Sequence, residues 1–209
     1  KVLVEGRLRV DLKRALEEGM AATQRHFPEC GPEQTQALWE FFLDRIRYYF
    51  RDVRGFAWDE VNAVLAGDWK TLPDVEARLY ALKLVRQTEN FEPLAASFKR
   101  IRNILRQAGW QGGQVRPELL DAPEERALYE EAGRVLAGVR RMRASDDYLQ
   151  ALAAIATLRP AVDAFFDRVL VNAPDESVRA NRLALLGGLF QEVSSIADFS
   201  EIVTTTTTG

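Results

Sequence analysis

Apolar residues recur along almost the whole chain at spacings of three, four and seven residues, while strict alternation of apolar and polar residues is confined to a few positions within 2–10. The first pattern is typical of helices that bury one face, and the second of half-buried strands. The chain is therefore predicted to be all-α, a helical bundle. The expected helices cover residues 12–26, 32–54, 58–66, 71–85, 93–108, 123–142, 145–158, 160–169 and 174–197.

Residues with known positional preferences mark the ends of these helices. Asp11 precedes an apolar repeat and is expected to cap it, and Pro32 is placed for a first helical turn. The cap of the 145–158 helix is expected to be either Ser145 or Asp146. Pro160 falls inside a continuing apolar repeat, where a proline either kinks a helix or restarts it.

The chain carries no internal repeat and no long linker that would divide it. We therefore expect one helical domain over residues 1–203, with the glycine-containing loop at 109–117 as the weakest point if there are two lobes. The threonine-rich residues 204–209 are expected to form a flexible tail. Because the sequence begins at Lys1 and enters an apolar pattern at once, the first helix is expected to be truncated, in a fragment of a longer protein.

Composition excludes several classes of function. With 28 Lys and Arg against 31 Asp and Glu, the net charge is -3, so the chain as a whole does not attract nucleic acid or anionic lipid. One cysteine, Cys30, and one histidine, His26, cannot supply a His/Cys zinc site, and no metal site is expected. Phosphate-loop, dinucleotide-binding and hydrolase motifs are missing, so no catalytic residues are expected. No apolar run is long enough for a membrane span and no secretion signal is found, which predicts a cytoplasmic protein without a membrane partner.

One stretch departs from the acidic background. Residues 93–117 contain five cations and no Asp or Glu. On a helix, Lys99, Arg102, Asn103 and Arg106 would form a stripe opposite the apolar face. Such a stripe can follow a phosphate backbone, and an asparagine within it can hydrogen-bond an unpaired base. The alternative is an ordinary solvated face.

Aromatic residues and a second group of arginines are assigned more ordinary roles. Most tryptophans are expected in the core, among them Trp39, Trp58 and Trp69, whereas Trp110 follows the basic helix beside a glycine-rich loop and is the exception that could stack on a base. The arginines within 134–143 are expected to pair with acids or cap a helix end.

Three long segments together resemble one family. They are residues 41–66 (FFLDRIRYYFRDVRGFAWDEVNAVLA), 91–107 (FEPLAASFKRIRNILRQ) and 158–186 (LRPAVDAFFDRVLVNAPDESVRANRLALL), followed by ADFS at 197–200. These segments are similar to the C-terminal region of bacterial glycyl-tRNA synthetase beta subunits. The resemblance implies a helical, DALR-type anticodon-binding domain.

The same resemblance implies a division of labour within a larger class II, α/β heterotetrameric enzyme. Glycine activation with ATP and magnesium would belong to the alpha subunit, so no cofactor is expected in this fragment and the fragment itself would be non-catalytic. Its expected partners are the tRNA for glycine, the alpha subunit and the remainder of the beta subunit, with no DNA. Its expected role is to recognise the tRNA at the anticodon during aminoacylation.

The resemblance also implies which residues bind tRNA. The first group lies in the KRxxNIL-like run and the second in the segment VNAPDESVRANRL. For Arg179 and Arg182, the alternative is ion pairing with Asp175 or Glu176. The full expected set is Lys99, Arg100, Arg102, Asn103, Arg106, Asn172, Arg179 and Arg182.

A rival hypothesis keeps the same fold and assigns it a different function. A helical protein-interaction or structural domain could mediate subunit assembly without direct RNA contact. Charge reversal at Arg102 and Arg106 discriminates the two, because it would leave tRNA binding unchanged under the rival hypothesis.

Overall fold

The computed structural model describes residues 1–28 and 31–204, so Cys30 and most of the threonine run lie outside the described residues. Within these ranges the chain is helical and contains no strand, which confirms the all-α prediction. The α-helices are α1 (Val2–Glu5), α2 (Leu12–Gln24), α3 (Pro32–Tyr48), α4 (Trp58–Leu65), α5 (Leu72–Val85), α6 (Phe91–Gln107), α7 (Pro123–Ala144), α8 (Tyr148–Ala156), α9 (Arg159–Arg168) and α10 (Glu176–Ser194). A π-helical turn, η1 (Tyr49–Val53), follows α3, and two short 3-10 turns are η2 (Pro117–Leu119) and η3 (Phe199–Glu201).

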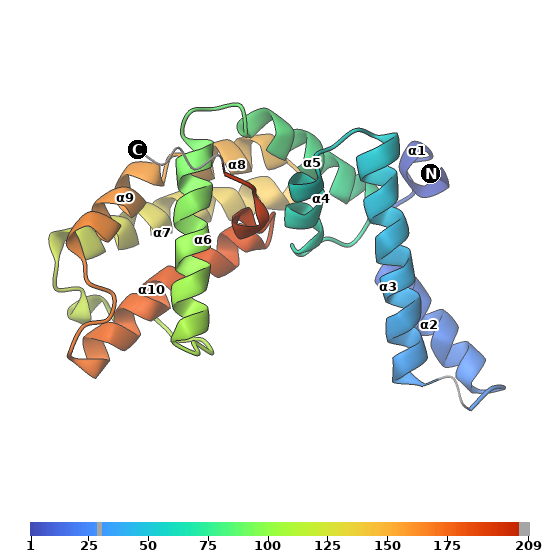
Figure 1. The fold of residues 1–209 in the computed structure, drawn as a ribbon, viewed down its shortest axis with the longest axis horizontal. Helices are drawn as coiled ribbons and strands as arrows, with labels where there is room; N and C mark the ends of the chain where they lie inside the picture. Colours follow the sequence, from blue (N-terminus) through green and yellow to red (C-terminus); the bar gives the residue numbers. More distant parts are fainter. Residues whose placement is uncertain (29–30, 205–209) are drawn as a thin grey trace.

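The helices form a packed body with a projecting arm. Figure 1 shows α2 and α3 as a hairpin that extends away from the body, which comprises α4 to α10. Within the body, α8 packs against α7 and α5, and α6 crosses α10 while also contacting η3 and α9. The arm buries little: Leu12 is the buried residue of α2 and Ile46 that of α3. Most of the hydrophobic core therefore lies in the body.

Aromatic packing joins α6 to the C-terminal segment. Phe91 and Phe98 of α6 are fully buried and contact the ring of Phe199 edge-on, with ring centroids 5.0 and 5.6 Å apart. On the other side of the segment, the Asp198 amide donates to the Ala63 carbonyl of α4 at 2.8 Å. The C-terminal segment thus lies between α4 and α6 and connects them.

A buried arginine holds the start of the same segment. Arg78 is 3% exposed, and its guanidinium donates to the carbonyls of Ser195, Ile196 and Asp68 while pairing with Asp74 at 2.9 Å. All of these bonds satisfy groups that would otherwise be buried without partners. The arginine therefore has a structural role.

Most predicted helix ends are confirmed. The Asp11 carboxylate accepts from the Arg14 amide, and α3 begins at Pro32. Pro160 restarts the chain as a separate helix, α9. The predicted cap of the 145–158 helix is wrong. Asp147, the residue after the two candidates Ser145 and Asp146, caps α8 by accepting from the Gln150 amide, and Asp146 adopts a left-handed conformation with φ of 59°.

One long apolar stretch, Tyr148–Arg168, meets the length and composition of a membrane-crossing helix. In the structure it is divided into α8 and α9, and buried side chains such as Leu152, Ile155 and Phe165 pack in the core. By length and composition this stretch departs from the expectation that no apolar run is long enough for a membrane span, and 39% of its most apolar window is buried within this chain.

The tryptophans overturn two expectations from the sequence. Trp39 and Trp69 are half-buried against the core and stack with ring centroids 5.7 Å apart, but Trp58, also expected in the core, is 56% exposed. Trp110, expected to be the open platform, is half-buried and lies directly on Gly187 of α10. A Cβ atom at position 187 would lie 2.3 Å from the indole ring, so only glycine allows this contact.

This contact predicts opposite effects for two adjacent glycines. Gly187→Ala should lower the free energy of unfolding by about 1–3 kcal/mol, because the indole must move out of a packed position. Gly188→Ala is the matched control: a Cβ there meets nothing within 4 Å, so it should raise stability by about 0.5–1 kcal/mol through helix propensity. Urea unfolding of both variants measures the difference, and equal effects would contradict the packing of Trp110.

Candidate nucleic-acid interface

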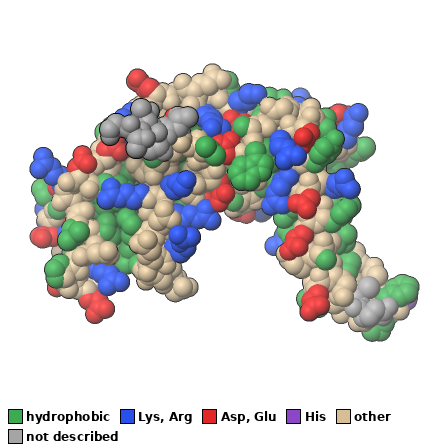
Figure 2. Space-filling view, viewed as in Figure 1, with side chains coloured by type: hydrophobic (Ala, Val, Ile, Leu, Met, Phe, Trp, Pro, Cys, Tyr) green, Lys and Arg blue, Asp and Glu red, His purple; other side chains and the backbone are tan. Residues whose placement is uncertain are grey.

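The exposed face of α6 carries the predicted basic stripe. The helix buries Phe98, Ile101 and Leu105, which leaves the opposite face in solvent. Figure 2 shows Lys and Arg side chains gathered over α6. The structure brings together all five predicted residues of this group, and all are exposed: Lys99, Arg100, Arg102, Asn103 and Arg106.

Three of these cations form no ion pair within the described residues. Lys99 is free of acidic partners, and Arg106 donates to the Asn103 amide oxygen at 3.3 Å. The Arg100 guanidinium lies over the ring of Phe166 in α9, 4.1 Å from its centroid. A cation on an aromatic face keeps its net charge while its position is fixed. We call Lys99, Arg100 and Arg106 the free cations of α6.

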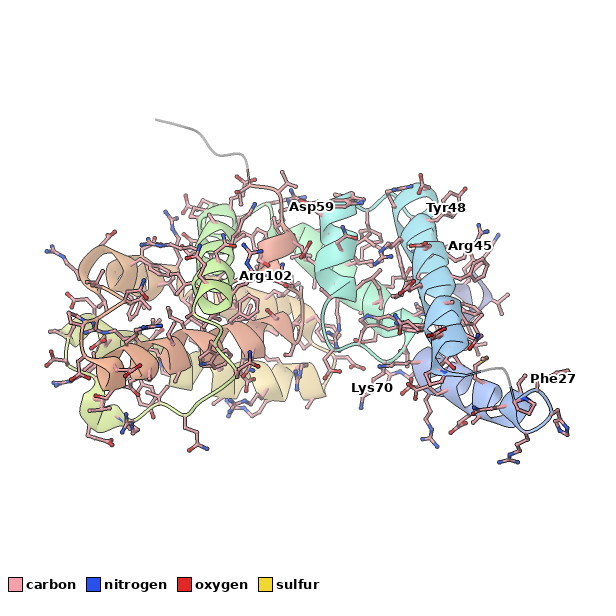
Figure 3. All side chains as sticks on the ribbon, turned by 60° about the horizontal axis from the view of Figure 1, so that its bottom comes forward. Phe27, Arg45, Tyr48, Asp59, Lys70 and Arg102 are labelled. Carbon is pink, nitrogen blue, oxygen red and sulfur yellow. The ribbon has the colours of Figure 1, made fainter. Side chains whose placement is uncertain are left out.

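Arg102 differs because its charge is already paired. Its guanidinium donates to Ser200 Oγ at 2.7 Å and to the Glu201 carboxylate at 2.5 Å, with Asp198 at 3.5 Å. The hydrogen bond that Arg102 donates to Glu201 raises the pKa of Arg102 above its ordinary value. Figure 3 shows Arg102 on the side of α6 next to the C-terminal segment. Its expected role in tRNA binding stays a prediction, and the structure adds a role in holding that segment on α6.

The second predicted group is dispersed rather than clustered with the first. Asn172 is exposed in the loop between α9 and α10, and Arg179 is half-buried in the first turns of α10. The alternative of an ion pair between Arg179 and Asp175 or Glu176 is not found in the described part of the chain. Asp175 instead caps α10 by accepting from the amides of Ser177 and Val178.

Arg182 lies inside the fold. Its guanidinium pairs with Glu125 of α7, whose side chain is 1% exposed, and donates to the Leu170 carbonyl at 2.8 Å. Burial alone would raise the pKa of Glu125, but the guanidinium and the amides of Ala122 and Asp121 hold that pKa below its usual range. The sequence offered Asp175 and Glu176 as partners, whereas the partner is Glu125. The tRNA-binding role of Arg182 stays a prediction, and its observed contacts are structural.

A neighbouring asparagine performs a similar task that sequence reasoning missed. Asn181 is 3% exposed, and its amide group both accepts from the Arg116 amide at 2.7 Å and donates to the Arg116 carbonyl at 3.0 Å. This pair of bonds fixes the loop after α6 to α10. The signal was its spacing: Asn181 comes three residues after Val178 and four before Leu185, on the apolar face of the helix, where a buried polar group requires a partner.

Two exposed arginines near the stripe were also left out of the predicted set. Arg116 follows α6 in the loop that Asn181 holds, and Arg168 ends α9, the helix that contacts α6. Neither side chain forms an ion pair within residues 1–28 and 31–204.

The expected pairing of the arginines in 134–143 is confirmed for Arg134 with Glu131 and for Arg140 with Glu192.

The described residues offer no cluster of three or more His, Cys, Asp or Glu side chains that could hold a metal ion. The two carboxylates spaced one turn apart in α9 have a simple explanation: Asp163 pairs with Arg159 at 3.3 Å, and Asp167 is exposed. The arrangement on and beside α6 is therefore suited to holding an anion through several cations.

Comparison with known proteins shows which family this part of the chain belongs to. The family model for the DALR anticodon binding domain matches residues 94–199, which is half of the chain and runs from the body of α6 to η3. The chain belongs to the DALR anticodon-binding domain family. The free cations of α6 and all three residues of the dispersed group fall within the matched segment.

The relatives extend the similarity over nearly the whole chain. A glycine–tRNA ligase beta subunit from Acidobacterium capsulatum is 43% identical over 97% of this chain and 30% of the relative. Proteins of the same name from Ralstonia nicotianae and Methylobacillus flagellatus are 37% and 36% identical, each over 97% of this chain and over 29% and 28% of their own length. The chain thus spans about 30% of the length of these relatives.

The buried pair between Arg182 and Glu125 predicts a large loss of stability when the guanidinium is removed. Arg182→Met keeps most of the apolar stem but leaves the carboxylate buried without a counter-charge, which should lower the free energy of unfolding by about 3–5 kcal/mol. Arg179→Met, three residues earlier on the same helix and without an ion pair in the described structure, should change it by no more than about 0.5 kcal/mol. Urea unfolding at neutral pH provides the comparison.

The same pair has a defined pH dependence. Because the folded-state pKa of Glu125 lies below its unfolded value of about 4.3, its contribution is complete above that pH and is lost as pH falls through the folded-state pKa. The gap in stability between wild type and Arg182→Met should therefore narrow on acidification. A gap that stays constant from neutral pH into this acid range would contradict the role assigned to the pair.

Proposed function

We propose that this chain is the anticodon-binding region of a glycine–tRNA ligase beta subunit and that it recognises the tRNA for glycine during aminoacylation. The observation that carries the proposal is the face of α6: it lies in the segment matched by the anticodon-binding family, and its free cations have no acidic partner within the described residues. The choice of glycine as the amino acid of the proposed tRNA rests on the names of the relatives, which are glycine–tRNA ligase beta subunits.

The proposed mechanism is binding rather than chemistry. Lys99, Arg100 and Arg106 would contact phosphates around the anticodon loop, and Asn103, between them on the exposed face, would reach the edge of an unpaired base. Selectivity would arise because a wrong base leaves such a polar group without its hydrogen bond. Arg116 and Arg168 extend the same positive surface beyond α6.

The rest of the aminoacylation reaction is assigned elsewhere. In this proposal the chain contributes no catalytic residue and binds no cofactor, while ATP and magnesium are used by the alpha subunit. Its partners are the tRNA, the alpha subunit and the remainder of the beta subunit, in the cytoplasm, without a membrane or DNA partner. The chain's share of the relatives' length, about 30%, supports a module that works within a larger assembly.

The proposal predicts a change in salt dependence when the free cations are neutralised. A Lys99→Gln, Arg100→Gln, Arg106→Gln variant should bind the tRNA for glycine more weakly and reduce the slope of log affinity against log salt by about 3, roughly one unit per lost phosphate contact. Arg134→Gln is the matched control, because Arg134 lies on α7, not on α6, and is already paired with Glu131 of its own helix. Filter binding or fluorescence anisotropy across a salt series measures both.

A change of opposite sign comes from Glu201. Glu201→Gln removes the nearest carboxylate from Arg102 and leaves Asp198 at 3.5 Å, so the less balanced cation should increase tRNA affinity and steepen the salt slope by at most about 1. If the triple variant and Glu201→Gln both bind the tRNA as wild type does, the face of α6 does not contact RNA and the rival function in protein assembly is favoured.

A further inference from the structure

A groove between α7 and α10 is not used by the proposed phosphate contacts. It has a volume of about 380 Å³ and an apolar floor that includes Ala132, Leu136 and Leu185. This volume falls within the range of small-ligand sites, which are mostly apolar with a few polar groups at fixed positions. The groove is thus large enough for a planar aromatic group.

Two glycines on opposite walls leave the groove open. Gly133 of α7 and Gly188 of α10 both line it, and a Cβ atom built on either one meets no atom within 4 Å. Helical glycine is unfavourable by about 1 kcal/mol relative to alanine, and neither glycine has a positive φ that would require it. The absence of a side chain at both positions therefore keeps the groove unfilled.

The rim supplies hydrogen-bonding groups rather than further apolar surface. The Tyr129 hydroxyl and the Gln191 amide have no hydrogen-bond partner within the described residues. Arg140 and Arg143 also line the groove, where Arg140 is paired with Glu192 and Arg143 donates to Ser195 Oγ. A ligand with a flat apolar face and a polar edge matches this combination, whereas an aliphatic side chain matches the floor alone.

The groove is connected to the candidate interface by the loop that follows α6. Val115 of this loop lines the groove, and the exposed Arg116 comes next in the chain. Asn181 fixes the backbone of Arg116 to α10, so the loop has a defined position between the Arg106 end of α6 and the groove. An RNA strand that leaves α6 at Arg106 would reach the groove by crossing this loop.

We propose that the α7–α10 groove receives one unpaired nucleobase of the RNA bound on α6. The proposal rests on the proposed function and adds a base-binding pocket to it. The base lies against the apolar floor, and the Tyr129 hydroxyl and the Gln191 amide meet its polar edge. Unpaired bases are recognised in proteins by this combination of an apolar contact and hydrogen bonds to the edge.

Filling the groove tests the proposal without removing any charge. Gly133→Leu should leave the melting temperature equal or higher and weaken binding of the tRNA for glycine by about tenfold or more, the value of one stacked base. The slope against salt should stay unchanged, because no phosphate contact is lost. Gly188→Leu fills the groove from the other wall and should give the same result.

The control is Gly138→Leu, on α7 but outside the groove lining, where a Cβ atom makes only ordinary contacts at 4.0 Å. It should bind tRNA as wild type does. If folded Gly133→Leu and Gly188→Leu proteins also bind as wild type does, the groove proposal is overturned while the proposed function stands. A wild-type chain that binds neither the tRNA for glycine nor a non-cognate tRNA overturns the proposed function and this inference with it.

Discussion

The arrangement of the functional end of the molecule depends on one buried charge. Glu125 is almost fully removed from solvent at the start of α7, and its counter-charge is Arg182 of α10. A buried carboxylate is costly unless it is paired and hydrogen-bonded, and here the guanidinium and two backbone amides satisfy it. The same guanidinium holds the Leu170 carbonyl, and the preceding residue, Asn181, holds the loop after α6. Two consecutive side chains of α10 therefore fix three connecting segments around the proposed RNA site.

Arginines of this chain divide into two groups by what they contact. Arg78, Arg102 and Arg182 satisfy carbonyls and carboxylates within the protein, so their charges are largely balanced. Arg100 and Arg106 are held by an aromatic face and an amide, and their charges remain available to an anion. Because exposed cations contribute to RNA binding mainly by neutralising phosphates, this division and not the count of arginines predicts the binding surface. It also explains how a chain of net negative charge can present a local positive face.

Structural features that depend on neighbouring residues could be predicted from the sequence. Helix starts at Pro32 and Pro123 and the cap at Asp11 follow from neighbouring residues, as does the amphipathic division of α6. Long-range pairing could not be predicted in this way, because Arg182 has acids at the start of its own helix, Asp175 and Glu176, but pairs with a residue 57 positions away. The tryptophans also could not be placed from neighbouring residues alone. Trp110 is half-buried because it packs against a glycine of another helix, and Trp58 is exposed although it begins a helix rich in apolar residues.

Hydroxyl-radical probing from a single tethered site tests most directly whether the face of α6 meets the anticodon. An iron chelate attached to Lys99→Cys, in a Cys30→Ser background, should cleave the bound tRNA for glycine within or beside its anticodon loop. The same chelate on Arg134→Cys, at an exposed position of α7, serves as the control and should give weaker or different cleavage. Cleavage from position 99 confined to another arm of the tRNA, or no cleavage above that from position 134, would contradict the account.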